Sequence, residues 1–414
     1  MIKSSSILLH GKMLLMYLFR RAQSIVSLFY KKDAKAILFV PHSNCRKDGY
    51  DIMNWTGDNV LCLAHYMIAS PSYDTYKKIL VVDPEDKIES FSNYCKQVNP
   101  NANVSFVHSK SAIRESWKVK YIFTSSSVQA FNNKTSKQVL VDLNYFTPFK
   151  NDYLYEKGFR RVVYKTRQCF DFVVTTAHLA SRIQALDLGL PLSSFIELGF
   201  PRNDIFYRDN QHVIRDYLQQ VIASDIKTIF VYTPTYRDYE KDLSIKRDLF
   251  GYPSFDYDKL GDLLEESNSI IIVKMHVLQI ENVDFYSIRK RCKRIVLFEE
   301  LNRQFSLYQC LSEADCLITD YTSVYFDFLH RNKPVIFNYY DIQEYSQERG
   351  FSFYPIEAIS AGYIVKQSDE LLNAINMVLN GDDRYYNERQ TIKKLFDSHY
   401  DGLSAKRICD YFFH

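Results

Sequence analysis

The 414-residue sequence is poor in glycine and proline, and its cysteines have none of the spacings of metal sites. Only 12 Gly and 11 Pro are present, which excludes collagen-like and low-complexity chains. The eight Cys form no C-x-x-C pair, so they predict reduced, mostly buried thiols, with no zinc site. At about 150 residues per domain, the length predicts two or three domains rather than a small disulfide scaffold.

Two common phosphate-binding motifs are also missing. Neither the G-x-G-x-x-G of dinucleotide-binding domains nor the P-loop G-x-x-x-x-G-K-[ST] occurs, so NAD, FAD and P-loop chemistry has no support. Residues 1–35 hold seven Lys or Arg against one Asp, a net +6, which leaves −3 for the rest of a chain whose formal charge is +3. A body without excess positive charge predicts no nucleic-acid partner.

Residues 1–34 form a basic segment with the pattern of an amphipathic helix. One side carries apolar residues at helical spacing: Leu8, Leu15, Leu18, Ala22, Ile25 and Phe29. No apolar run here reaches the roughly 20 residues of a membrane-spanning helix, and Arg20-Arg21 interrupts what would be a secretory signal. A cationic amphipathic helix suits the surface of an anionic membrane, and the alternative is a helix packed on the protein's own body.

After residue 35, short runs rich in Val, Ile and Phe alternate with longer helical patterns. This alternation predicts an α/β protein of βαβ units, with parallel sheets buried on both faces. The first series of expected strands is 36–40, 78–82, 103–107, 119–124, 138–143 and 171–175. The second series is 228–233, 269–274, 294–298, 315–319 and 334–338.

The two series predict two Rossmann-like domains, residues 35–198 and 199–380, with a hinge near 199–215. Two such domains facing across a cleft would turn the carboxyl ends of both sheets toward one crevice, where open α/β sheets bind ligands. Residues 381–414 are expected to form helices, and analogy of fold suggests that these cross back to the first domain.

The stretch 315–345 holds the pattern that points most directly to chemistry. A buried strand is followed by the turn 320–323 and at once by a helix, so the hydroxyls of Thr322 and Ser323 lie at a helix N-terminus, where N–H groups bind anions such as a diphosphate. Asp327 lies one turn further on the same helix face. It is expected to bind a ligand hydroxyl, with a solvated helix charge as the alternative.

Three other polar loops follow strands or lie at the domain junction. They are Gly199-Phe200-Pro201-Arg202-Asn203-Asp204, Pro234-Thr235-Tyr236-Arg237-Asp238 and Lys274-Met275-His276. These loops match, in order, the motifs G-[YF]-P-R-N-D, P-T-[YF]-R-D and K-[LM]-H. Further along the chain, Thr319–Ser323 matches T-D-Y-[ST]-S, and Asp327-Phe328 and Lys333-Pro334 match the D-F and K-P that follow it. The sequence therefore resembles the CDP-glycerol glycerophosphotransferase family, the TagB/TagF-like teichoic acid and capsule enzymes with a GT-B fold. The resemblance covers about residues 55–365 and is strongest after 199.

The resemblance implies a GT-B-like transferase that moves glycerol phosphate, or another polyol phosphate such as ribitol phosphate, from a CDP-activated polyol. The implied acceptor is a hydroxyl of a lipid-linked teichoic acid or capsule precursor, CMP is released, and the enzyme is peripheral on the cytoplasmic face of the bacterial membrane. Around the donor the resemblance places Arg202, Pro234, Thr235, His276, Thr322, Ser323 and Asp327. Arg237 is a further candidate for substrate binding, with an ordinary ion pair as its alternative.

In this implied reaction, charge builds on the departing CMP and must be met by fixed hydrogen-bond donors. Arg202 and the 322–323 turn supply them, and His276 can donate a hydrogen bond or a proton to the same phosphates. We therefore expect no metal and no cofactor besides the donor substrate.

One departure from the family pattern concerns the general base. Family members carry W-H-G-T-P-L-K in the first domain, whereas aligning Thr147-Pro148 and Lys150 leaves Asn144-Tyr145-Phe146 in place of Trp-His-Gly. His42, after strand 36–40, is the best replacement because an unperturbed His has a pKa near 6.5. Asp142 and Tyr145 are further candidates, and a group not identified here, or no base at all, stays open.

Two other functions remain alternatives. One is a GT-B glycosyltransferase that uses a nucleotide sugar, and the other is a catalytically impaired family member that acts as a binding partner. The sequence leaves open whether the donor carries glycerol or ribitol, which hydroxyl accepts, whether transfer is single or repeated, and the oligomeric state.

Overall fold

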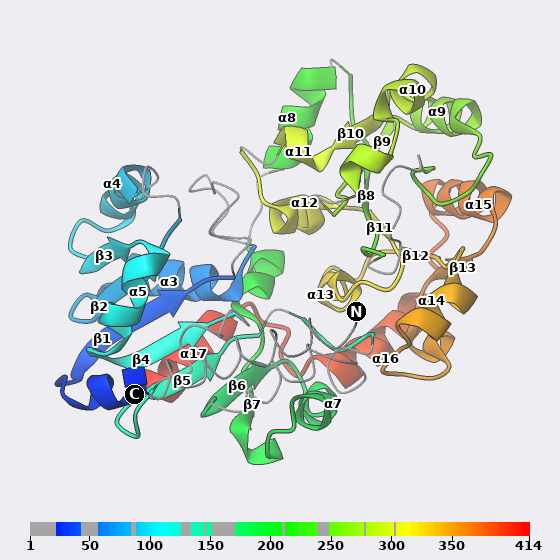
Figure 1. Cartoon of the computed structure of the whole chain (residues 1–414). Coiled ribbons are helices and arrows are strands. Elements are labelled where there is room, and N and C mark those ends of the chain that lie inside the picture. The colour runs from blue at the N-terminus through cyan, green and yellow to red at the C-terminus, as the bar shows by residue number, and fades with distance from the viewer. Residues whose placement is uncertain are drawn as a thin grey trace, which may run out of the picture. The chain divides into compact units, whose positions relative to one another are not determined.

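The computed structural model describes residues 22–42, 57–83, 88–125, 134–144, 146–150, 170–208, 212–222, 224–237, 248–276, 279–301 and 304–414. The chain divides into two compact units. Unit 1 comprises Met1–Tyr145, Asp152–Asp204 and Leu403–His414, and unit 2 comprises Phe146–Asn151 and Ile205–Gly402. Each unit holds one parallel sheet with helices against it, labelled in Figure 1.

Unit 1 is built on a seven-stranded parallel sheet in the order β3-β2-β1-β4-β5-β6-β7. Its strands are β1 (Asp33–Val40), β2 (Lys77–Val81), β3 (Val104–Val107), β4 (Val119–Thr124), β5 (Val139–Asp142), β6 (Phe172–Thr175) and β7 (Phe195–Glu197). All six expected strands of the first series are confirmed. The edge strand β7 was not predicted, because Glu197 limits its apolar run to Phe195 and Ile196.

Alternate side chains of each central strand of unit 1 are buried on opposite faces of the sheet. On β1, Ile37 and Phe39 pack with α3 (Asn59–Ala69), α4 (Ile88–Val98) and α17 (Ser404–Phe413). Leu38 and Val40 pack on the other face with α5 (Ser109–Ser116) and α7 (His178–Leu188). A parallel sheet buried on both faces is the arrangement that the apolar runs predicted.

The C-terminal helix α17, red in Figure 1, belongs to unit 1 although it ends the chain. The carboxylate of Asp204 accepts hydrogen bonds from the N–H groups of Ser404 (2.9 Å) and Ala405 (3.0 Å) at the start of α17. These bonds hold residues 199–204 in unit 1, so the division falls between Asp204 and Ile205, whereas the sequence placed the boundary after residue 198.

Unit 2 has a six-stranded parallel sheet in the order β10-β9-β8-β11-β12-β13. Its strands are β8 (Thr228–Thr233), β9 (Ser269–Val273), β10 (Ile295–Leu297), β11 (Cys316–Thr319), β12 (Val335–Asn338) and β13 (Tyr363–Val365). Five of them confirm the second predicted series, and β13 is another three-residue edge strand that the sequence did not reveal.

The helices of unit 2 cover both faces of its sheet. They are α8 (Val213–Ile222), α9 (Tyr257–Glu266), α10 (Phe285–Arg291), α11 (Phe298–Leu301), α12 (Leu307–Glu313), α13 (Val324–Phe328), α14 (Ile342–Glu348), α15 (Ser368–Leu379) and α16 (Tyr386–Phe396). One-turn 3₁₀ segments of the chain are η2 (Pro71–Tyr73), η5 (Leu192–Ser194), η7 (Ile280–Asn282) and η8 (Ile356–Ile359), and η6 (Pro201–Tyr207) is longer.

The order of strands reverses once in each sheet. In unit 1 the chain leaves β1 toward β2 and returns on the other side as β4, and in unit 2 it leaves β8 toward β9 and returns as β11. Loops at the carboxyl ends of the two strands that flank such a reversal diverge and leave a crevice, where α/β proteins bind their ligands. The topology thus singles out the ends of β1 and β4, and of β8 and β11.

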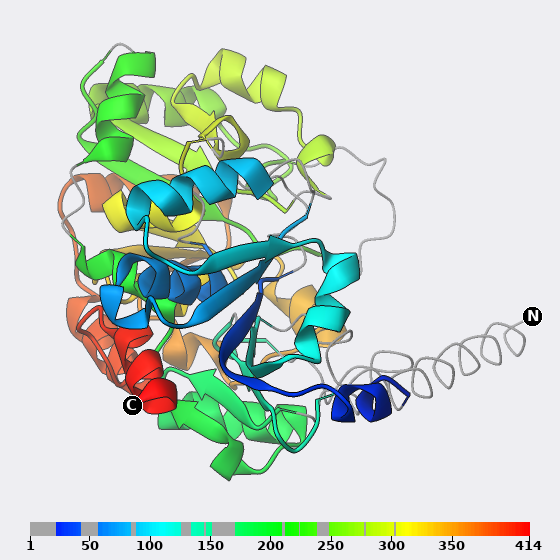
Figure 2. The same cartoon turned by 90° about the vertical axis from the view of Figure 1, so that its left-hand side faces the viewer.

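Residues 22–28 form a short helix, dark blue in Figure 2, that leads into β1. Its polar residues Gln23 and Ser27 are buried, at 7% and 0% exposure, whereas Ile25, Leu28 and Phe29 are 59%, 63% and 85% exposed. The remainder of the predicted amphipathic segment, residues 1–21, lies outside the described residues. Within the described part of the chain, every helix is too short or too polar to cross a bilayer.

Candidate active site

The loops after β8 and β11 leave the sheet of unit 2 from adjacent positions. Thr233 and Thr319, the last residues of these strands, are partners in the ladder, and their hydroxyl oxygens are 3.3 Å apart. The loop 234–237 and the turn 320–323 therefore start side by side at the reversal of strand order. The structure brings together here two of the motifs that the sequence analysis singled out.

Asp320 ties these two loops together. Its carboxylate accepts hydrogen bonds from the Thr235 N–H (2.8 Å) and the Thr235 hydroxyl (2.6 Å), and it pairs with Arg237. Asp320 is 1% exposed, so these bonds are made away from water, where they are strong. Because the hydroxyl of Thr235 donates its hydrogen to Asp320, that hydroxyl can only accept a hydrogen bond from a ligand.

Arg237 lies at the centre of a buried cluster rather than at the surface of the site. Its guanidinium donates to Asp320 (2.6 Å), to Asp341 (2.8 and 3.0 Å) and to the carbonyl of Thr235 (2.6 Å), and its side chain is 2% exposed. The ring of Tyr321 lies 5.2 Å from it. The ion pair that was the alternative for Arg237 is therefore present, and in this arrangement Arg237 positions the loops around it; its binding of substrate stays a prediction.

Thr322 and Ser323 are half-buried at the end of β11, beside this cluster. No described residue accepts a hydrogen bond from the main-chain N–H of either one, and Ser323 precedes α13 without a side-chain capping bond. The helix α13 has only five residues, so an anion at this turn would be held by the local N–H and hydroxyl groups more than by a helix dipole.

His276 follows β9, the neighbour of β8 in the sheet. Its imidazole stacks on the ring of Tyr236, with centroids 4.4 Å apart and an angle of 25° between the planes. Pro234 and Tyr236 are half-buried, as is His276. Burial, followed by the positive charges of Lys274 and Lys150, lowers the pKa of His276 below its usual value of 6.5. At neutral pH the ring is therefore uncharged and has one N–H to donate.

Asp327 does not present its carboxylate at the surface of unit 2. It is 1% exposed and accepts a hydrogen bond from the hydroxyl of Tyr308 on α12 at 2.6 Å. The sequence predicted that it binds a ligand hydroxyl, with a solvated helix charge as the alternative. The carboxylate is not a solvated helix charge, because the helix packs this face inward against α12, and its binding of a ligand hydroxyl stays a prediction.

In unit 1, His42 comes two residues after β1, at the reversal of that sheet. It is half-buried, and its N–H donates to Asp58 (3.2 Å). The other carboxylate oxygen of Asp58 caps α3 by accepting from the N–H groups of Val60 (2.8 Å) and Leu61 (3.1 Å). The start of α3 thus fixes the backbone from which the imidazole of His42 extends.

Asp142 ends β5 and is 4% exposed, and it accepts the N–H of Asn144 at 2.8 Å. One strand, β4, separates β5 from β1, so about two strand spacings, roughly 10 Å, lie between the strand ends that carry Asp142 and His42. The two candidates for the base are therefore alternatives rather than a pair. Tyr145, the third candidate, lies outside the described residues.

Arg202 is 5% exposed in unit 1, and its guanidinium carbon lies 5.2 Å from the ring centre of Phe200. Its main-chain N–H donates to Asn59 (3.1 Å), while the amide of Asn59 donates to the carbonyls of Leu143 (3.1 Å) and Asn144 (2.9 Å). Asn59 thereby joins the loop that follows β5 to the loop that follows β7.

Sequence reasoning missed three residues that organise these sites: Asn59, Asp320 and Asp341. Their roles depend on partners 83 or more positions away along the chain, as in the pairs Arg237–Asp320 and Arg237–Asp341. As for metals, the described residues contain no group of three His, Cys, Asp or Glu side chains that could hold an ion.

Comparisons with known proteins show the family and the fold of the chain. The family described as CDP-Glycerol:Poly(glycerophosphate) glycerophosphotransferase matches residues 29–414. The teichoic acid glycerol-phosphate primase of Bacillus subtilis (strain 168) is 27% identical over 247 residues, 60% of this chain and 58% of that protein. The teichoic acid glycerol-phosphate transferase of Staphylococcus aureus (strain NCTC 8325 / PS 47) is 27% identical over 267 residues, 63% of each chain. The alignments thus span less than two thirds of these curated relatives.

Among solved structures, a variant of the wall teichoic acid polymerase TagF with CDPG soaked in matches with a TM-score of 0.69. The match covers 99% of this chain and 97% of that one at 19% identity. At this identity the likeness shows the fold, and it confirms the predicted GT-B-like class with two Rossmann-like units.

Proposed function

Because the chain belongs to the CDP-glycerol:poly(glycerophosphate) glycerophosphotransferase family, we propose that it transfers a polyol phosphate from a CDP-activated polyol to an acceptor hydroxyl. The proposed donor is CDP-glycerol and the proposed acceptor is a lipid-linked teichoic acid or capsule precursor. The observation that carries the proposal is the cluster at the reversal of the unit 2 sheet, where the turn 320–323, the loop 234–237 and His276 follow adjacent strands.

The proposed reaction is a displacement at phosphorus. The acceptor oxygen forms a bond to the phosphorus that carries glycerol, the bond from that phosphorus to the bridging oxygen breaks, and CMP leaves with the bridging oxygen. The proton of the acceptor hydroxyl passes to a base. Negative charge grows on the oxygen that CMP retains, so the groups that lower the barrier are donors fixed before the reaction.

Unit 2 offers such donors in its loops. The N–H groups and hydroxyls of Thr322 and Ser323 can bind phosphate oxygens, and the loop that carries Thr235 is held in place by Asp320 and Arg237. A neutral His276 can donate its N–H to the diphosphate, and the negative charge of a bound diphosphate would raise the pKa of the ring again and favour its cationic form.

For the base, we propose His42. Asp142 is buried, and a carboxylate oxygen already accepts the N–H of Asn144, whereas His42 is only half-buried and its main-chain N–H donates to Asp58, which fixes the position of its backbone. An imidazole is a far better proton acceptor at neutral pH than a phenol, whose usual pKa is near 10, so Tyr145 ranks lower.

We also propose that the enzyme works at the cytoplasmic face of a bacterial membrane, where a lipid-linked acceptor is found. The helix 22–28 exposes Ile25 and Leu28, and the turn after it exposes Phe29, while Ser27 is buried against Lys32 and Gln138. A helix packed on the body of the protein for its own stability would bury the apolar side instead. Lys31 and Lys35 are exposed next to it and would attract anionic lipid head groups.

The test is release of CMP by the purified full-length chain in the presence of a lipid-linked saccharide acceptor. CDP-glycerol, CDP-ribitol and UDP-sugars are offered separately. Release of CMP from CDP-glycerol supports the proposal, and release from CDP-ribitol alone would change the polyol but keep the reaction. Turnover of UDP-sugars only, or of none of the donors, would overturn it.

A further inference from the structure

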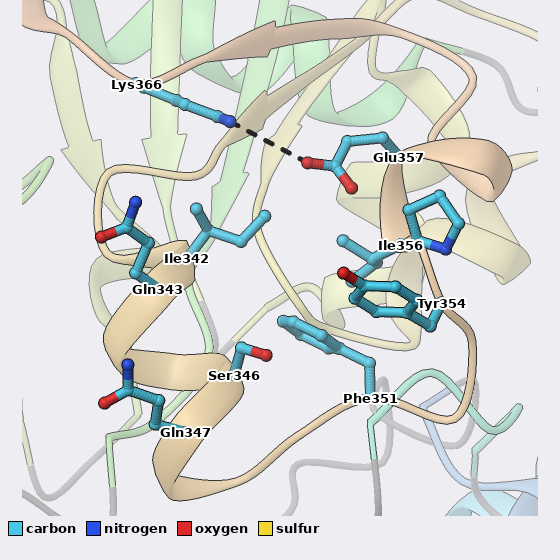
Figure 3. A pocket seen from close by; sticks show the side chains of 10 residues that line it. Ile342, Gln343, Ser346, Gln347, Phe351, Tyr354, Ile356, Glu357 and Lys366 are labelled. Atoms are coloured by element: carbon cyan, nitrogen blue, oxygen red, sulfur yellow. Dashed lines mark ion pairs between the residues drawn. The ribbon is translucent and has the colours of Figure 1, made fainter.

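Unit 2 contains an open groove of about 610 Å³ that none of the residues discussed above as site candidates lines. Figure 3 shows it between the helix α14 on one side and the segment leading into η8 on the other. All of the described residues that line it belong to unit 2. Its lining suggests what kind of molecule it takes.

The base of the groove is apolar and firmly packed. Ile356 is only 2% exposed. Phe351 is half-buried, and its ring stacks on Tyr345 with centroids 5.6 Å apart and planes at 19°, and it also contacts Tyr321 at 5.1 Å. Tyr345 and Tyr321 in turn flank Arg237, so the base of the groove is continuous with the buried cluster behind the turn 320–323.

One wall of the groove carries a solvent-exposed aromatic ring. Tyr354 is 94% exposed, although tyrosine rings stabilise proteins mainly by losing contact with water. An exposed ring beside an apolar base offers a flat face to a ligand whose own surface has both C–H and O–H groups. The C–H side of a sugar ring has that character.

The opposite wall, α14, supplies neutral hydrogen-bonding groups. Gln343, Ser346 and Gln347 lie three and four positions apart, so they share one side of the helix, and all three are exposed. In Figure 3 the hydroxyl of Ser346 points toward Phe351. Amide and hydroxyl groups both donate and accept, as a set of sugar hydroxyls requires.

The charge of the lining distinguishes a neutral ligand from an anionic one. The charged residues that line the groove are Glu357 and Lys366, which approach each other to 3.9 Å, so they sum to zero. A polymer of glycerol phosphate carries one negative charge per unit and would need an excess of Lys or Arg. The groove has no such excess.

From the exposed ring, the amide wall and the balanced charge, we propose that this groove binds a neutral saccharide. The identification of that saccharide as part of the acceptor rests on the proposed function, whereas the binding itself does not. In the proposed reaction the groove would hold a sugar of the acceptor on the same unit that binds the donor. Its loss would therefore weaken acceptor binding and leave donor binding unchanged.

The test uses the full-length protein and ligand-observed NMR titrations with maltotetraose, cellotetraose and chitotetraose. Tyr354→Ala and, separately, Gln347→Ala are compared with Tyr286→Ala, a matched control because Tyr286 lies on α10 and is 72% exposed. We expect either groove variant to weaken binding of the preferred sugar by about 3- to 10-fold, the range of one aromatic or hydrogen-bonding contact. The control should bind as the parent does.

Three results would overturn the proposal. They are failure of all three sugars to bind, equal binding by the groove variants and the control, and stronger binding of short poly(glycerol phosphate) that is lost with Lys366→Gln. A parallel titration with CDP-glycerol separates the two proposals. If CDP-glycerol does not bind but Tyr354→Ala still weakens sugar binding, the proposed function fails and the groove assignment stands.

Discussion

Arg237 and Asp320 form an ion pair of 2.6 Å in which both side chains are 2% exposed. The pair links the loop after β8 to the turn after β11, and Asp341 closes the cluster on the other side of the guanidinium. Removing one member of such a group leaves buried charge without compensation, which costs more than the intact pair contributes. The positions of the loop 234–237 and the turn 320–323 therefore depend on a buried ion pair.

The first prediction follows from this cluster. Arg237→Met should lower the free energy of unfolding by about 3–5 kcal/mol, because Asp320 and Asp341 would stay buried without their cation. Denaturant unfolding followed by circular dichroism measures the loss. Arg291→Met is the control, since Arg291 makes its ion pairs at the exposed surface of α10 and should leave the midpoint unchanged. Equal midpoints for the two variants would contradict this account of Arg237.

The second prediction concerns His276. His276→Ala should reduce the rate of CMP release by about 10²- to 10⁴-fold, because a donor to the diphosphate is removed. His276→Gln, which restores an N–H group, should recover part of the rate. His178→Ala is the control, because the side chain of His178 is 57% exposed and lies on α7 of unit 1. A rate close to that of the parent in His276→Ala would exclude the proposed role.

The third prediction is a dependence of stability on pH that comes from the same histidine. The pKa of His276 is lower in the folded protein than in the unfolded chain, so the unfolded chain binds more protons below about pH 6.5. Its contribution to stability is full above pH 6.5 and declines as the pH falls through the interval below. His276→Gln, which does not titrate, should therefore lose less stability than the parent between pH 7.5 and 5.5. Melting temperatures at the two pH values measure the difference, and parallel losses would show that His276 is not the group concerned.

The fourth prediction tests Lys274 as one cause of that lowered pKa. Lys274→Met removes a positive charge next to the ring, so the pKa of His276 should rise toward 6.5 without reaching it, because burial, the larger cause, remains. An NMR titration of the imidazole protons gives the value directly. Lys290→Met serves as the control, since Lys290 lies over Tyr286 on α10. An unchanged pKa in Lys274→Met would assign the shift to burial and Lys150.

The fifth prediction concerns the helix 22–28. The double substitution Leu28→Ser and Phe29→Ser should reduce sedimentation with vesicles of anionic phospholipid at least about 10-fold, because two apolar side chains no longer insert. Leu186→Ser, at a position 73% exposed on α7, is the control. Binding by the parent should also weaken with salt, as attraction between lysines and anionic lipid requires. Equal sedimentation of the double variant and the control would refute the membrane proposal.

Much of the fold could be read from the sequence because buried parallel strands are continuous apolar runs. The predicted strand 269–274 corresponds to β9 and the predicted strand 228–233 to β8, and the predicted and observed ends differ by at most one residue. The edge strands β7 and β13 were not predicted because their apolar runs are short, Phe195-Ile196 before Glu197 on β7 and Tyr363–Val365 on β13, whereas the run of β10 continues to Phe298. Their strand conformation depends on pairing with β6 and β12, which is information from elsewhere in the chain.

The site was predictable to the level of loops but not of individual side chains. The motifs placed Thr235, His276 and Thr322 at the carboxyl ends of neighbouring strands, and the structure has them there. The direction in which Arg237 and Asp327 point could not be inferred, because it depends on Asp341 and Tyr308, which lie in other elements. The sequence of a motif does not distinguish a charged residue that binds a ligand from one that binds a buried partner.

The ladder between Thr233 and Thr319 joins positions 86 residues apart, and this spacing has a consequence for how unit 2 is made. While the chain emerges from the ribosome, β8 is complete long before β11 exists, and until then one edge of β8 offers its hydrogen-bonding groups to any neighbour. Truncated products that stop before residue 316 would keep that open edge, and we expect them to aggregate rather than persist as soluble fragments.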